Sequence, residues 1–75
     1  MNDERKNMRY KDFLIDVKPL PLRDSSEWTT HFVLFRDQGY RMLEVAKVEM
    51  GNRCVSEEEA TKVGIREAMR LADQQ

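Results

Sequence analysis

The chain has 75 residues, 13 of them Lys or Arg and 14 Asp or Glu, which gives a formal net charge of −1 at pH 7. A domain of this size buries only roughly 60–65% of the surface that its unfolded chain exposes, so it forms one small core and gains stability from oligomerisation. The balanced charge argues against a protein whose whole surface is adapted to nucleic acid or to an anionic membrane, and it leaves only local patches for such contacts.

Cys54 and His31 are the sole cysteine and histidine of the sequence. One cysteine allows no disulfide within the chain, and the two residues together fall short of the three or four protein ligands of a zinc site. We therefore expect no metal and no cofactor. Residues 1–11 lack the apolar segment of a signal peptide, and no run approaches the ~18 apolar residues of a membrane span. These features predict a cytoplasmic protein without membrane contacts.

The first nine residues are mostly polar and have no apolar face. This composition predicts a flexible N-terminal leader over residues 1–9, followed by one domain over residues 10–75. The basic side chains of the leader could instead form an arm for phosphate contacts. Acidic neighbours dilute their charge, so the leader remains the preferred interpretation.

Three segments have the pattern of β-strands. In residues 10–17, Phe13, Ile15 and Val17 point to one face, as in a half-buried strand. Residues 40–50 form another strand, reached by a hairpin, and a change of apolar face near residues 44–46 predicts a β-bulge there.

The intervening segment, residues 27–36, is the most apolar of the three. It carries Trp28, Thr30, Phe32 and Leu34 on one face and Thr29, His31, Val33 and Phe35 on the other. Because neither face is purely polar, we expect a central strand covered on both sides, or one face on a helix and the other against a second chain.

Residues 55–73 have the signals of an amphipathic helix. Ser56 is a favourable N-cap, and Glu59 completes a capping box whose carboxylate should accept from the Ser56 amide. Val55 and Ala60 occupy the positions of a hydrophobic staple. The row of Ala60, Gly64 and Ala68 faces one side, and Gly64 predicts a close approach of the helix to the sheet.

Two groups of side chains are candidates for binding. Lys62, Arg66 and Arg70 form a basic stripe at i, i+4, i+8 spacing, either a nucleic-acid contact or an ordinary solvated helix face with Glu partners. Trp28, Phe32 and Tyr40 could stack on bases, but core or dimer packing is the stronger interpretation, which makes them candidates for a sheet-face interface.

Neither His31 nor Cys54 belongs to a recognisable catalytic motif, and Cys54 has no resolving cysteine. The three consecutive glutamates, residues 57–59, diverge by ~100° per residue on a helix, so they suit the cap better than a metal ion. We therefore expect a protein that is not an enzyme.

The order of these elements resembles a group of small uncharacterised bacterial β-β-β-α domains over roughly residues 10–74. The resemblance lies in residues 10–17, in the start of the second strand at 27–29, in the capped stretch 55–60, and in Gly64 with residues 71–73. A similar layout occurs in HicB-type antitoxins and, more loosely, in double-stranded RNA-binding domains. The resemblance implies a fold and transfers no catalytic residue.

We predict an α+β domain, a three-stranded antiparallel meander with the C-terminal helix packed on one face. The leading hypothesis is a non-enzymatic protein-interaction domain that self-associates as a homodimer or binds a protein partner. The alternative is a nucleic-acid-binding or antitoxin-like module that uses the basic stripe.

Overall fold

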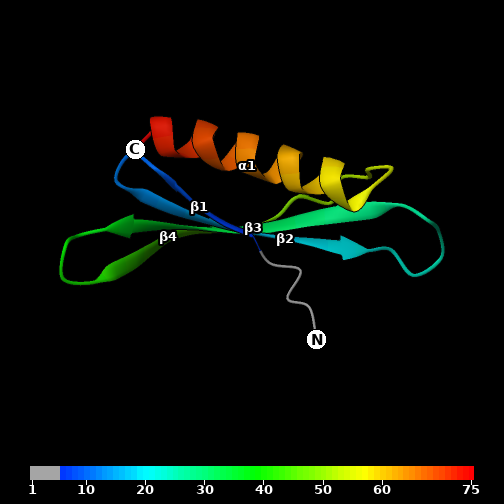
Figure 1. Ribbon diagram of the computed structural model, residues 1–75, viewed down its shortest axis with the longest axis horizontal. Helices are drawn as coiled ribbons and strands as arrows, with labels where there is room; N and C mark the ends of the chain where they lie inside the picture. Colours follow the sequence, from blue (N-terminus) through cyan, green and yellow to red (C-terminus); the bar gives the residue numbers. More distant parts are fainter. Residues whose placement is uncertain (1–5) are drawn as a thin grey trace.

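The computed structural model describes residues 6–75, in which a four-stranded antiparallel sheet is followed by one helix (Figure 1). The strands are β1 (Lys6–Tyr10), β2 (Phe13–Pro21), β3 (Trp28–Asp37) and β4 (Met42–Glu49), and the helix is α1 (Glu57–Asp73). The strands lie side by side in chain order, as a meander. α1 crosses one face of the sheet and packs on β2 and β3. The α+β class and the position of the helix are as predicted.

The prediction of three strands missed β1. This strand pairs with β2 from Lys6 opposite Val17 to Tyr10 opposite Phe13. The expected leader is therefore wrong for residues 6–9, while residues 1–5 lie outside the described part of the chain. The segment was overlooked because only Met8 and Tyr10 are apolar, and both pack against the core.

The turn between β1 and β2 takes an unusual backbone conformation at Lys11, whose φ of 56° lies in the left-handed region. The end of α1 holds this turn in place. Asp73 accepts from Lys11 Nζ at 2.7 Å and from Tyr10 Oη at 3.0 Å. Two segments more than sixty residues apart in sequence are thus joined by one carboxylate, and Lys11 and Tyr10 lower the pKa of Asp73.

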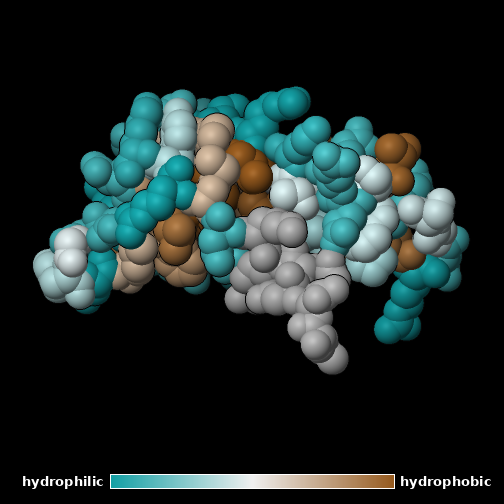
Figure 2. All heavy atoms as spheres, in the orientation of Figure 1, coloured by the Kyte–Doolittle hydropathy of each residue, from teal (hydrophilic) through white to brown (hydrophobic). Residues whose placement is uncertain are grey.

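The core lies between α1 and the inner face of β2 and β3. Figure 2 shows hydrophobic residues gathered between the helix and the sheet, with hydrophilic residues along the outer side of the helix. The buried side chains alternate along each strand, and the helix contributes its small residues. They are Phe13, Ile15, Val17, Phe32, Leu34, Ala60, Ala68 and Ala72. The predicted core faces of residues 10–17 and of the helix are confirmed.

At Gly64 the helix backbone lies close to the sheet. A Cβ atom at this position would lie 2.5 Å from Thr30 Cγ2 and 2.8 Å from Val17 Cγ1. Thr30 is fully buried, and its hydroxyl donates to the carbonyl oxygen of Ala60 at 2.9 Å. The close approach inferred from Gly64 is confirmed, and a side-chain hydrogen bond fixes the helix at this height.

The start of α1 differs in detail from the prediction. Ser56 Oγ accepts from the Glu59 amide at 3.1 Å, as a capping box requires. The Glu59 carboxylate, however, accepts from the Val55 amide at 2.8 Å, and not from the Ser56 amide. The expected staple is also wrong, because the Val55 side chain is 80% exposed and leaves Ala60 to the sheet.

The predicted bulge in the last strand is confirmed. Leu34 lies opposite Ala46 and Phe35 opposite Glu44, so Val45 is the extra residue of β4. Past β4 the chain returns to β3, where Trp28 and Cys54 exchange both backbone hydrogen bonds at 2.8 and 2.7 Å. Asn52 Oδ1 accepts from the Thr30 amide at 3.1 Å, which fixes the connection into the helix.

Substitution of Gly64 by alanine tests the close approach. Gly64→Ala should lower the free energy of unfolding by about 1–2 kcal/mol, because overpacking outweighs the gain in helix propensity of about 1 kcal/mol. Urea denaturation measures the change, with Arg66→Ala on the exposed side of α1 as the control. Adding Thr30→Ser should recover part of the loss, since serine keeps the hydroxyl and lacks Cγ2. A Gly64→Ala variant as stable as the wild type would contradict this packing.

The Asp73 contacts make a pH-dependent contribution to stability. A carboxyl whose folded-state pKa is lowered stabilises the fold above its unfolded-state value of 3.8 and loses this effect as the pH falls through the folded-state pKa. Asp73→Asn should therefore be less stable than wild type at neutral pH, and the difference should vanish in acid below pH 3.8. Denaturant titrations over a pH series measure it. A difference that stayed constant in acid would mean that charge plays no part.

Candidate interaction face

One face of the sheet is not covered by α1, and we call it the open face. It is formed by the side chains that alternate with the core residues on β2, β3 and β4. The half-buried Val33 and Phe35 lie along its centre on β3, with Leu14 beside Phe35 on β2. The open face comprises Leu14, Asp16, Lys18, His31, Val33, Phe35, Glu44, Lys47 and Glu49.

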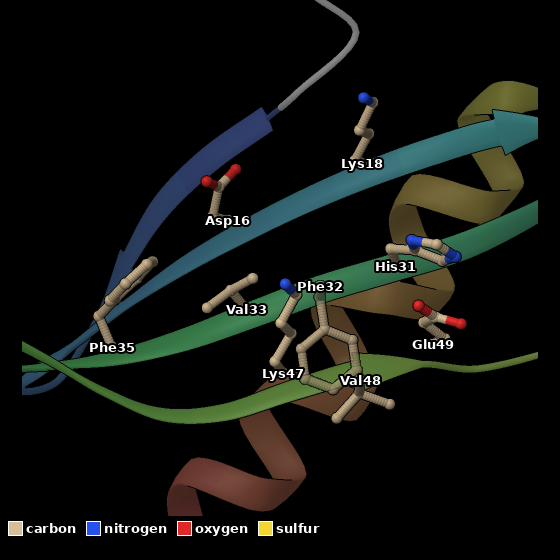
Figure 3. A pocket seen from close by; sticks show the side chains of 9 residues that line it. All are labelled: Asp16, Lys18, His31, Phe32, Val33, Phe35, Lys47, Val48 and Glu49. Atoms are coloured by element: carbon tan, nitrogen blue, oxygen red, sulfur yellow. The ribbon is translucent and has the colours of Figure 1, made fainter.

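The open face is hollowed over β3. A depression of about 340 Å³ is bounded by β2 on one side and β4 on the other. Figure 3 shows Asp16 and Lys18 rising from β2, His31 and Val33 from β3, and Glu49 beside His31 on β4. Such a hollow offers a floor of apolar side chains with charged groups at its rim.

The charges on the open face alternate in both directions. Along β2, Asp16 is followed by Lys18, and along β4, Lys47 is followed by Glu49. Across the sheet, Lys18, His31 and Glu49 form one row, and the neighbouring row runs from Asp16 through Val33 to Lys47. In these two rows, Asp16, Lys18, Lys47 and Glu49 form a checkerboard, with unlike charges at every neighbouring corner.

Three of these corners have no intramolecular partner within residues 6–75: no hydrogen bond or ion pair joins the side chain of Lys18, Lys47 or Glu49 to another described residue. Strands are ≈ 4.8 Å apart, so Lys18 and Glu49 lie about 10 Å from each other across β3. Within the described part of the chain, the charges of Lys18, Lys47 and Glu49 are thus not paired with another side chain.

The three aromatic residues predicted as a sheet-face interface do not share a face. Phe32 is 1% exposed and lies in the core beneath α1, so it is wrong as an interface residue. Trp28 is half-buried on the same side of β3, and Tyr40 is 83% exposed in the turn before β4. The other face of β3, with Val33 and Phe35, is the open one. The phase of the Thr30, Phe32 and Leu34 face, the more apolar of the two, could have indicated this assignment.

The basic stripe of Lys62, Arg66 and Arg70 lies on the exposed side of α1. Lys62 Nζ lies 3.8 Å from a Glu58 carboxylate oxygen, and Arg70 forms an ion pair with Glu67. This pair raises the pKa of Arg70 and lowers that of Glu67. Arg66 has no ion pair with any residue in the described range 6–75, so it is the freest cation of the stripe.

His31 and Cys54 lie in different environments. The His31 ring lies on the open face, and no hydrogen bond joins it to another side chain among the described residues. Cys54 is buried and accepts a contact from Asn52 Nδ2 at 3.2 Å. Burial and the nearby Glu59 carboxylate raise the pKa of the Cys54 thiol, which disfavours the reactive thiolate.

Within residues 6–75, no three His, Cys, Asp or Glu side chains are grouped so that they could hold a metal ion. The helix of this part of the chain is neither long nor apolar enough to cross a lipid bilayer. Comparisons with models of protein families, with curated protein sequences and with solved structures found no match to the chain. The geometry of the open face and of the basic stripe is therefore the basis for a functional proposal.

Proposed function

We propose that this protein is a non-enzymatic interaction domain that self-associates through the open face. The observation that supports this most directly is the half-burial of Val33 and Phe35 at the centre of the sheet face that α1 does not cover. An antiparallel sheet that faces water ordinarily presents polar residues on that side. Apolar side chains in this place favour a protein surface as the covering layer.

The free energy gained by burying Val33 and Phe35 also favours association. Fully burying a Val or Phe side chain stabilises by about 1.5–3 kcal/mol, and a symmetric interface counts each contribution twice. A small domain also gains from any additional burial, because its own core is limited. Val33 and Phe35 supply contact area and no group for proton transfer or nucleophilic attack, so the proposal is a binding surface. Its compartment, in our proposal, is the cytoplasm, where a free thiol such as Cys54 stays reduced.

Two valine substitutions test the open face. Val33→Glu places a charge on the open face, while the matched control Val55→Glu makes the same change at a position that is 80% exposed beside α1. We expect Val33→Glu to weaken self-association by roughly tenfold or more, and Val55→Glu to leave it unchanged. Sedimentation equilibrium over a concentration series gives both dissociation constants, and circular dichroism checks the fold of each variant.

Two results would count against the proposal. The first is a wild-type protein that stays monomeric at millimolar concentration. The second is a folded Val33→Glu variant that associates as tightly as the wild type.

The second candidate function is nucleic-acid binding by the basic stripe. It is favoured by the exposure of all three cations on the side of α1 away from the sheet and by the guanidinium of Arg66, which has no ion pair with another residue of the range 6–75. It is disfavoured by the ion pairs of Lys62 and Arg70, which reduce the charge available to phosphates.

Replacing Lys62, Arg66 and Arg70 together by Glu tests the second candidate. If they contact phosphates, binding to labelled DNA and RNA should weaken for all sequences, and the log–log dependence on salt should lose roughly one unit of slope per contact. Fluorescence anisotropy at several salt concentrations measures this, with Arg23→Glu in the turn between β2 and β3 as the control. Equal binding by the triple variant and the wild type would remove this candidate.

A further inference from the structure

The checkerboard of Asp16, Lys18, Lys47 and Glu49 has a symmetry that suits a second copy of the same chain. Asp16 and Lys18 lie on β2, and Lys47 and Glu49 lie at the matching rows of β4 with the opposite sign. β3 runs between them as the centre line (Figure 3). A rotation that exchanges the β2 side and the β4 side while keeping the rows therefore places unlike charges over each other.

We propose that the open face binds the open face of a second copy, with the two-fold axis parallel to β3. This arrangement rests on the proposed self-association and specifies its geometry. Lys18 then meets Glu49 of the second copy on both sides of the axis, and in the next row Asp16 and Lys47, which have opposite charges, face each other. On the axis itself, Val33 lies over Val33 and Phe35 over Phe35.

The distances of sheet packing are compatible with these contacts. Stacked sheets lie ≈ 10 Å apart, a gap that a lysine and a glutamate side chain close from opposite sides. Aligned sheets cross at about −30°, so each β3 would be inclined by about 15° to the two-fold axis, and the charged corners would move by only about 3 Å from perfect superposition. The apolar strip of Val33 and Phe35 is excluded from water, while Lys18 and Glu49 remain at the rim, where charges select the partner and fix the register.

A second stacking is electrostatically allowed and can be separated by experiment. If the two-fold axis ran perpendicular to the strands, between the rows of His31 and Val33, Lys18 would face Asp16 of the second copy and Glu49 would face Lys47. In that stacking Phe35 faces Thr29 of the second copy, and the contact between the two Phe35 side chains is lost. The aromatic contact on the axis favours the arrangement parallel to β3.

Charge reversal at Lys18 and Glu49 is the decisive experiment. Lys18→Glu alone and Glu49→Lys alone each place like charges together in the proposed dimer, so each should raise the dissociation constant of self-association by roughly tenfold or more. The double variant Lys18→Glu/Glu49→Lys restores opposite charges and should regain wild-type association. An equimolar mixture of the two single variants should form heterodimers, because all four contacts between unlike chains are then attractive.

Sedimentation equilibrium gives the dissociation constants, and native mass spectrometry with one variant ¹⁵N-labelled counts the heterodimers. Arg66→Glu, the same change of charge on the exposed side of α1, is the matched control and should leave association within about twofold of wild type. Glu49→Lys provides an independent reversal if Lys18→Glu does not fold.

The outcomes separate the geometry from the proposed function. A wild-type chain that never associates overturns both. A wild-type chain that associates, with a double variant and a mixture that do not recover, overturns only the axis parallel to β3, because in the perpendicular stacking the double variant faces like charges at every corner. Recovery in both the double variant and the mixture supports the proposed arrangement.

Discussion

The structure depends on the close contact between α1 and the β2–β3 pair at Gly64. Thr30 and Val17 occupy the space that a side chain at this position would need, and the Thr30 hydroxyl bonds to the helix carbonyl of Ala60. On the adjacent turns, the small residues Ala60 and Ala68 are fully buried as well. A helix this close to the sheet buries its row of small residues, and it packs mainly on β2 and β3 among the four strands.

Because α1 is the one helix of the described residues, it covers one face of the sheet and leaves the open face uncovered. α1 covers the inner side of β2 and β3. Hydrogen bonds of Ser56 and Glu59 stabilise the start of this helix, and the contact of Asp73 with Lys11 stabilises its end. The chain in the described range has no second helix to lay over Val33 and Phe35. The packing of α1 on one face of the sheet therefore stabilises the fold and leaves the open face, on which the proposed function rests, uncovered by the helix.

Sequence periodicity predicted the strands and the helix that bury apolar side chains on one side only. The alternation of Phe13, Ile15 and Val17 and the spacing of the helix residues each have one apolar side, so both core faces could be assigned. β1 could not, because an edge strand needs only Met8 and Tyr10 to be apolar and its remaining residues resemble a polar leader. On β3 both faces carry apolar residues, and only the greater apolarity of the Thr30, Phe32 and Leu34 face indicates which one meets the helix. The prediction of Phe32 as an interface residue did not use this difference and is wrong.

The edges of the sheet also bear on how two copies would meet. β1 is a short edge rich in polar residues, and β4 carries a bulge at Val45 together with Glu44, Lys47 and Glu49. Short strands, bulges and charges are the features by which proteins prevent edge-to-edge pairing. Both edges thus disfavour pairing between copies, which agrees with the proposed contact through the open face. In that proposal the apolar strip supplies the attraction, and the checkerboard selects a surface that carries the opposite charges at the same spacing. A second copy of the chain, turned about β3, has that pattern.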